Sequence, residues 1–396
     1  MNSPEAPGGR NSGIPRKQAL RFVVLAGVVS LFADITYEGA RSIVGPYLAV
    51  LGASGTAVGM VAGFGEFVGY GLRLASGFVS DRTGRYWSIT VIGYLINLAA
   101  VPLLALAGRW ELAAALLIAE RLGKGIRTPA RDAMLSHAAS RLGAGWAFGL
   151  HEALDQIGAV AGPLILAAAL GSGGSYRAGF AILLAPALTA IAILLVARTL
   201  YPQPRDLEPA APGLASSGLP PAYWVYLAAA GTMAAGYADF PLIAYHFQQA
   251  KVFSPDWIPI CYAVAMAMDA VAALVFGRLF DRIGLSALAA VSLVSSLFAP
   301  LVFLGDFSLA LFGMALWGIG VGAQESVMRA AVAGMVPPDR RGSAYGLFNA
   351  GYGVAWFLGS ALLGALYDIS LPALIVFSVA AELVSAPLFL AAKRAR

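Results

Sequence analysis

Long apolar stretches recur along the whole chain, and short polar segments separate them. Each stretch is about 20 residues long, the length at which an α-helix crosses about 30 Å of hydrocarbon. Only 12% of the residues are charged and 59% are hydrophobic, whereas soluble domains carry about 25% charged residues. A water-soluble fold of this length would lack the polar surface to cover such a core. We therefore predict an all-α membrane protein.

The apolar pattern predicts twelve membrane-spanning helices in two six-helix bundles, at residues 20–49, 56–79, 87–107, 111–138, 146–170, 177–199, 223–249, 257–279, 285–304, 308–335, 343–365 and 371–391. A segment rich in Pro, Gly and Ser separates the sixth span from the seventh. The predicted units are a cytoplasmic N-terminal tail (1–19), an N-terminal bundle (20–199), a cytoplasmic linker (200–222) and a C-terminal bundle (223–392). Pro46 is expected to break the first span, and Pro129 to kink or end the fourth.

The basic residues indicate how the chain lies in a membrane. Lys and Arg concentrate in the loops on the side of the N-terminus, and the loops of the other side hold only Arg109, Arg177 and Lys251. Because cytoplasmic loops carry the excess of basic residues, we expect both termini to be cytoplasmic, in the inner or plasma membrane. No clustered basic face of the kind that binds nucleic acid is visible, so no nucleic-acid partner is expected.

Two short segments repeat at nearly equal offsets, which indicates a duplicated chain. The loop after the second span recurs 200 positions later, with Gly77, Asp81, Arg82 and Gly84 matched by Gly277, Asp281, Arg282 and Gly284. A nine-residue segment that begins at Gly145 matches one that begins at Gly342 at five positions. Two similar halves in the same orientation are related by an axis along the membrane normal.

These residues resemble the major facilitator superfamily over residues 20 to 392. Its loop motif, Gly-x-x-x-Asp-Arg-x-Gly-Arg, is met from Gly77 to Arg85, although Tyr86 replaces the basic residue that follows. Arg121 and Gly125 are similar to the family's Arg-x-x-x-Gly. In the fifth span, the spacing of Gly149, Gly158, Gly162 and Pro163 resembles the antiporter motif of the exporters. The glycines that close that motif are absent here. The run from Arg121 to Leu135 resembles poorly characterised bacterial permeases. The resemblance implies secondary transport by alternating access.

The repeated loops carry the residues for which we expect a conformational role: Gly77, Asp81, Arg82, Gly84, Arg85, Asp281 and Arg282. A carboxylate at a helix end can face the positive N-terminus of another helix or an arginine, and such contacts form in one global state and break in the other. In the family the loop is implicated in a latch of the outward-open state. The alternative is that a basic loop simply anchors the helices at the membrane surface.

Charged residues inside the first half form three helical faces. Asp34, Glu38 and Arg41 share one face of the first span, and Glu120, Lys124 and Arg127 share one face of the fourth. The fifth span adds Glu152 and Asp155. A charge at mid-membrane costs at least about 2.5–3.5 kcal/mol, so these groups need partners or a water-filled cavity. One interpretation is that these groups carry protons or contact the substrate, and the alternative is that they form buried ion pairs. The basic residues of the fourth span could bind a carboxylate or phosphate group of a substrate, unless the buried acids pair with them.

Other candidates are fewer. Asp239 and His246 lie seven residues apart in the seventh span; His246 either titrates near neutral pH or is merely hydrogen-bonded. The sequence His151-Glu152-x-x-Asp155 resembles a damaged zinc-hydrolase motif, but it lacks the second histidine. We therefore expect no metal, no cofactor and no enzymatic activity.

The expected function is proton-coupled export of a small organic solute by a monomer in the lipid bilayer. No nucleotide-binding loop is present, so an ion gradient is the expected driver. Import of a small organic anion or zwitterion is the first alternative, and an intramembrane enzyme or a channel is the alternative of another class.

Overall fold

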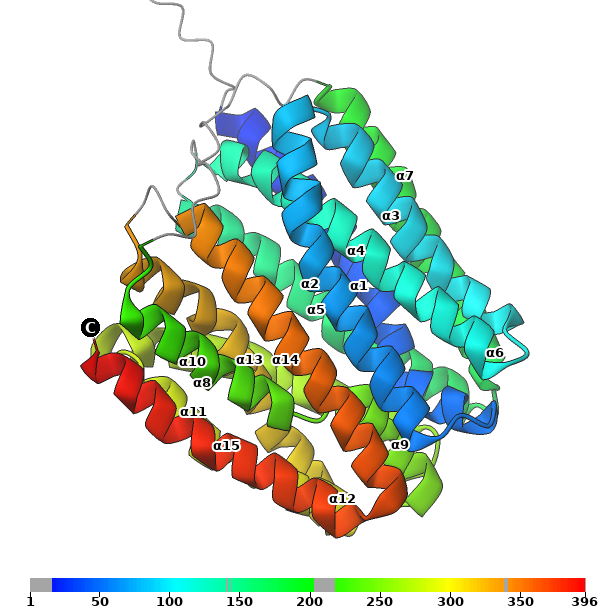
Figure 1. Ribbon diagram of the computed structural model, residues 1–396. Coiled ribbons are helices and arrows are strands. Elements are labelled where there is room, and N and C mark those ends of the chain that lie inside the picture. The colour runs from blue at the N-terminus through cyan, green and yellow to red at the C-terminus, as the bar shows by residue number, and fades with distance from the viewer. Residues whose placement is uncertain (1–15, 140–141, 143, 203–217, 338–340, 396) are drawn as a thin grey trace, which may run out of the picture.

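The computed structural model describes residues 16–139, 142, 144–202, 218–337 and 341–395. Every regular element within these ranges is a helix, as the sequence predicts (Figure 1). In chain order the helices are α1 (Arg16–Val50), α2 (Gly55–Thr83), α3 (Tyr86–Leu103), η1 (Leu104–Leu106), α4 (Trp110–Ala139), α5 (Ala144–Gly171), α6 (Tyr176–Ile182), α7 (Leu184–Leu200), α8 (Pro221–Gly236), α9 (Phe240–Ala250), α10 (Trp257–Ile283), α11 (Ser286–Ser295), α12 (Phe298–Leu304), α13 (Phe307–Met335), α14 (Arg341–Ile369) and α15 (Leu371–Arg394).

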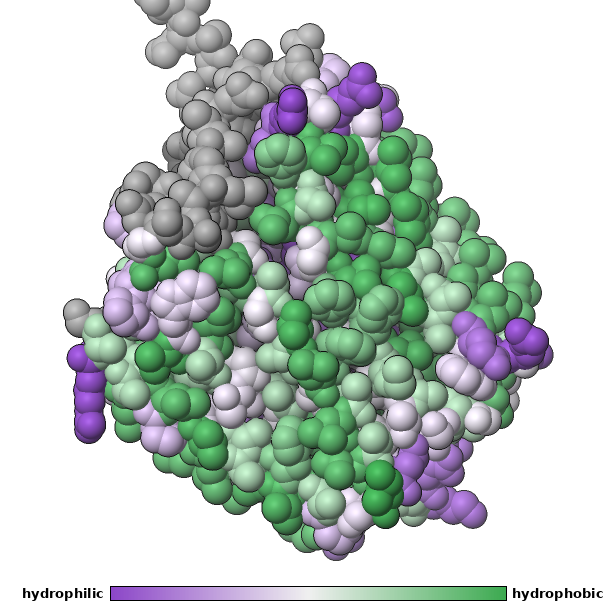
Figure 2. Space-filling model, in the orientation of Figure 1, coloured by the Kyte–Doolittle hydropathy of each residue, from purple (hydrophilic) through white to green (hydrophobic). Residues whose placement is uncertain are grey.

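The predicted spans match these helices one for one when α3 is taken with η1, α6 with α7, α8 with α9 and α11 with α12. In the described part of the chain, nine helical segments are long and apolar enough to cross a bilayer. The glycine-rich α2, the charged α4 and the interrupted α8–α9 pair fall outside that set. Apolar side chains cover most of the face in Figure 2, as a surface in contact with lipid requires.

Proline has two different outcomes in this fold. Pro46 and Pro129 lie inside α1 and α4, which continue to Val50 and Ala139, so the expectation of a break at Pro46 is wrong. The seventh span, by contrast, is not continuous: α8 ends at Gly236 and α9 restarts at Phe240, with Pro241 in its first turn. Proline suits the first turn of a helix because the backbone N–H groups of that turn have no acceptor within the helix, so the N–H that proline lacks is not needed there.

Helices α1 to α7 lie on one side of Figure 1 and α8 to α15 on the other. Contacts between these two groups run mainly through α1 with α9, α2 with α14, and α5 with α10. We refer to the two groups as the first and second halves. The bundle boundaries at 199 and 223 stay a prediction, since most of the linker lies outside the described residues.

Hydrogen bonds between the halves gather at one end, which we call the sealed end: the end where α1 is connected to α2. Both carboxylate oxygens of Asp368 accept backbone N–H groups at the start of α2, at 2.9 Å from Gly55 and 2.7 Å from Thr56. The hydroxyl of Tyr245 donates to the carbonyl of Ala53 at 3.1 Å. We call the other end, where α2 is connected to α3, the open end.

Candidate functional site

A large cavity lies between the halves. It encloses about 1940 Å³ including the solvent at its mouth, and α1, α2, α4, α5, α10, α13 and α14 line it. Its lining runs from Arg41, past the middle of α1, to Asp132 late in α4 and Glu152 early in α5. The cavity therefore lies between the middle of the molecule and the open end, while the Asp368 contacts close the sealed end.

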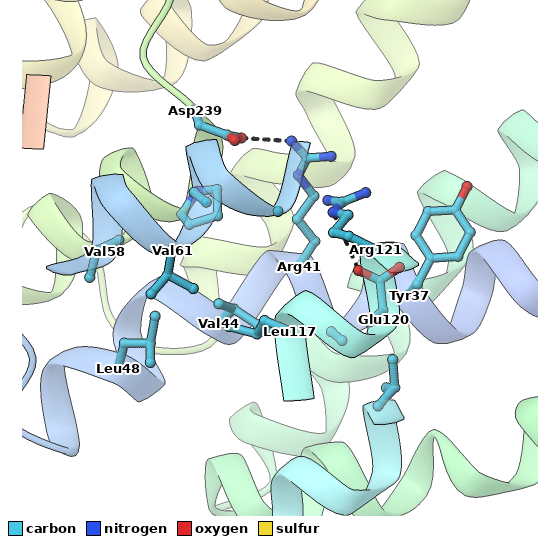
Figure 3. Close-up of a pocket in the computed structure, with 15 residues that line it drawn as sticks. Tyr37, Arg41, Val44, Leu48, Val58, Val61, Leu117, Glu120, Arg121 and Asp239 are labelled. Carbon is cyan, nitrogen blue, oxygen red and sulfur yellow. Dashed lines mark hydrogen bonds and ion pairs between the residues drawn. The ribbon is translucent and has the colours of Figure 1, made fainter. Parts of the chain in front are cut away.

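The structure brings most of the predicted polar residues together in this main cavity: Asp34, Glu38, Arg41, Lys124, Arg127, Glu152 and Asp155. Glu120 and Asp239 instead line a smaller cavity of about 520 Å³ on the sealed side, which shares Arg41 with the main one (Figure 3). His246 is buried elsewhere, with its Nδ1 3.2 Å from the hydroxyl of Tyr367. The structure therefore favours the hydrogen-bonded alternative for His246.

An ion pair joins the halves at the floor of the main cavity. Arg41 Nη2 lies 2.6 Å from Asp239 Oδ1 (Figure 3). The same nitrogen lies 3.5 Å from Glu66 Oε1. Asp239 precedes α9 at the break in the seventh span, and its other oxygen accepts from Trp356 Nε1 at 3.4 Å. Since Asp239 belongs to the second half and Glu66 to the first, Arg41 can exchange partners between the halves.

The charge network continues into the first half through a second arginine. Arg121 pairs with Glu66 at 3.2 Å and with Glu120 at 3.3 Å, and Glu120 accepts from Asn97 Nδ2 at 2.7 Å. For these residues the ion-pair alternative holds. The sequence singles out Arg121 only through its family motif, because its partner Glu66 lies on another helix.

The other two arginines late in α4, Arg127 and Arg131, have surroundings that differ from those of Arg121. Arg131 pairs with Asp132, at 2.8 Å from its Nη2. Arg127 is almost fully buried, yet its Nε and Nη1 have no hydrogen-bond partner among the described residues, and its guanidinium carbon lies 4.2 Å from the centre of the Tyr94 ring. Arg131 therefore has an acid partner among the described residues, whereas Arg127 has none.

Most of the rings that line the main cavity come from the second half, and Tyr37 and Tyr70 of the first half line it as well. Trp317, Asn349, Tyr352 and Trp356 of the second half line it, whereas Tyr245 and Tyr345 do not. Tyr262 was missed, although its hydroxyl donates to Glu38 Oε2 across the halves at 2.5 Å. The position of Tyr262 in the sequence does not distinguish it from a tyrosine that only packs in the core. What distinguishes it is the hydrogen bond to the carboxylate of Glu38 on α1.

Close packing of α5 against α1 explains two of the motif glycines. A Cβ atom at Gly158 would collide with the backbone of Leu31 and one at Gly162 with that of Ile35, so both positions need a residue without a side chain. Pro163 lies inside α5, which continues to Gly171. Gly149 has open space around it, so the expected packing is absent at that residue.

The repeated loops lie at the open end. Gly84 and Gly284 both have positive φ, 60° and 63°, at the ends of α2 and α10. Asp81 accepts a hydrogen bond from the Tyr86 hydroxyl at 3.2 Å. The remaining charged residues of the two loops, Arg82, Arg85, Asp281 and Arg282, are exposed. In this conformation, open at the end where they lie, the described contacts of Asp81 stay within its own half.

His151 Nε2 lies 3.8 Å from Asp155 Oδ2. No group of three or more His, Cys, Asp and Glu side chains capable of holding a metal ion occurs within the described ranges. The arrangement can thus exchange a proton, but it supplies no set of metal ligands there.

Comparison with known proteins adds the family. A profile described as Major Facilitator Superfamily matches residues 26–303 and 225–396. An uncharacterised protein of Mycobacterium tuberculosis is 44% identical over 378 residues, which cover 94% of this chain and 92% of that protein. An uncharacterised MFS-type transporter of Methanocaldococcus jannaschii is 34% identical over 141 residues, 35% of each chain.

Solved transporters share the fold. The nucleoside transporter NupG aligns with a TM-score of 0.73 at 14% identity, covering 94% of this chain and 99% of its own. A POT family transporter in complex with a thioalcohol-conjugated peptide aligns with a TM-score of 0.77 at 12% identity, covering 94% and 96%. The twelve predicted spans, the duplicated loops and the profile match lead to one conclusion. The chain belongs to the Major Facilitator Superfamily.

Proposed function

We propose that this chain, a secondary transporter by its family, exports a small organic solute in exchange for protons. Alternating access is supported by a cavity that opens at one end while hydrogen bonds between the halves close the other. The excess of basic residues at the open end supports a cytoplasmic location for that end and for both termini, in the inner or plasma membrane. Each chain has its own cavity, so a monomer suffices.

Proton coupling is the step that the buried acids support best. Asp34 lines the main cavity, and its neighbours within electrostatic reach are Asp155, Lys124 and Glu38. A carboxyl group that is protonated on one side of the membrane and deprotonated on the other links the proton gradient to the conformational change. Export, rather than import, is supported by the close packing of α1 and α5 at Gly158 and Gly162, positions that resemble the antiporter motif.

Import of an anion or zwitterion is the second candidate, and Arg127 favours it, since its Nε and Nη1 have no partner among the described residues. An enzyme would need a nucleophile or a metal site, and a channel would conduct without saturation. We therefore propose no enzymatic activity, no cofactor and no nucleic-acid partner.

Asp34→Asn is expected to abolish pH-dependent solute movement, because an amide cannot carry the proton. Cells that express the wild type should accumulate a solute in the medium, more at acidic external pH, and this difference should vanish with Asp34→Asn in paired metabolite profiles. Asp132→Asn is the matched control, since Asp132 already pairs with Arg131 at 2.8 Å. Unchanged pH dependence in Asp34→Asn would exclude Asp34 as the carrier, and a solute enriched inside the cells would reverse the direction.

Asp81→Ala is expected to slow transport about tenfold while leaving the amount of protein in the membrane unchanged. We propose that Asp81 gains contacts with the second half when the open end closes, and one hydrogen bond to a charged group contributes about 1.5–3 kcal/mol. Efflux rates normalised to membrane protein measure the effect. Glu111→Gln, at an exposed acid of the sealed end, is the control. A wild-type rate for Asp81→Ala would leave the loop as a surface anchor.

A further inference from the structure

One pole of the main cavity offers unpaired hydrogen-bond donors. Arg127 is 1% exposed, and neither its Nε nor its Nη1 has a partner among the residues that the structure describes. One turn earlier on the same face of α4, the ammonium of Lys124 lies 3.9 Å from the centre of the Tyr37 ring. No described carboxylate lies within ion-pair distance of either cation. A buried guanidinium without hydrogen bonds is costly, and an oxyanion is the ligand that satisfies it.

The opposite pole offers unpaired acceptors. Asp269 of α10 is 3% exposed and lines the main cavity, and its Oδ1 has no hydrogen-bond partner in the described part of the chain. Gln156 Oε1, on α5, likewise has no donor among the described residues. Two acceptors without donors match an ammonium group, which carries only donors.

Aromatic side chains of the second half form the remaining wall. Tyr262, Trp317, Phe348, Tyr352 and Trp356 all line the cavity. Rings of this kind bind a flat or apolar body, as in most small-molecule sites.

We infer that the cargo is a zwitterion with a small apolar body. Its carboxylate or comparable oxyanion binds Arg127, assisted by Lys124, and its ammonium group binds Asp269 and Gln156. An ion with one charge leaves one pole unsatisfied. Asp34 and Glu38 also face Lys124, so Arg127 is the residue that defines the anionic pole. The inference rests on the proposed transport function and deepens it. Because Arg127 belongs to the first half and Asp269 to the second, such a cargo bridges the halves.

Three probes that share one ring system test this inference: phenylalanine, 3-phenylpropionate and 2-phenylethylamine. Binding to the purified full chain in detergent is followed by quenching of tryptophan fluorescence, since Trp317 and Trp356 line the cavity. Phenylalanine is expected to bind about tenfold more tightly than either analogue, because each analogue loses one charge-assisted contact.

The variants assign the poles. Arg127→Gln should lower phenylalanine affinity about tenfold, to the level of the amine, and Asp269→Asn should lower it to the level of the acid. Arg109→Gln removes an exposed cation outside the main cavity, and it should change all three affinities less than twofold. If Arg127→Gln does not fold, Arg127→Lys keeps the charge and loses only the fork of donors.

Either analogue binding as tightly as phenylalanine would overturn the inference, and so would the absence of quenching by all three probes at about 10 mM. Equilibrium binding needs no gradient. If the purified chain binds phenylalanine selectively but moves no solute in cells, the inference about the cargo stands and the proposed transport is refuted. If cells show gradient-driven movement of a singly charged solute, the proposed transport stands and the inference about the cargo is refuted.

Discussion

Replacing Asp239 by Ala is expected to destabilise the protein by about 3 kcal/mol, because it leaves the partly buried Arg41 without its nearest partner. The pair is 2.6 Å apart and Asp239 is 3% exposed. Removing one member of a buried ion pair costs about 3–5 kcal/mol, and Glu66, 3.5 Å from Arg41, retains part of the attraction. Thermal or denaturant unfolding of the purified protein measures the loss.

A double-mutant cycle isolates the pair. Arg41→Met with Asp239→Ala should recover most of the stability lost in Asp239→Ala, since no unpaired charge then remains. The exposed pair Arg109–Glu111, at 3.8 Å, is the matched control: Glu111→Ala should cost less than about 0.5 kcal/mol. Additive losses at Arg41 and Asp239 would show that the two side chains do not stabilise each other.

Asp368→Ala is expected to open the sealed end. Asp368 accepts from the backbone of Gly55 and Thr56 and from the Thr56 hydroxyl, at 2.9, 2.7 and 2.6 Å, and thereby caps α2 from the other half of the molecule. Losing about 1.5 kcal/mol of charge-assisted bonding at this exposed site changes the ratio of the two conformations about tenfold.

Thiol labelling reports that opening. In a chain whose single cysteine, Cys261, is replaced by Ser, a Val58→Cys side chain is buried at the sealed side and should react about tenfold faster when Asp368→Ala is added. Asp306 is the matched control, because it caps α13 within its own half, at 3.1 Å from Ser308 N. Asp306→Ala should leave the labelling rate unchanged. Equal rates in both variants would contradict a role for Asp368 in closing this end.

The sequence predicts which side chains share a helical face, and it does not predict their partners. Spacing places Asp34, Glu38 and Arg41 together, and all three line the main cavity. The partner of Arg41 is Asp239, 198 residues later, and only the packing of α1 against α9 brings the two together. Likewise, the apolar pattern of the seventh span continues through residues 237–239, whereas the backbone there is not helical. Hydropathy indicates which segments lie in lipid, and it does not indicate where the hydrogen bonding of a helix is interrupted.

The unequal walls of the main cavity have a consequence for how such permeases diverge. The α4 cations and the α1 acids belong to the first half, whereas Trp317 and Phe348 belong to the second. Changes at Trp317 or Phe348 can therefore alter the size and shape of the cavity without touching those charged residues. A duplicated chain can thus reshape the wall that one copy contributes while the charged faces of the other copy stay as they are.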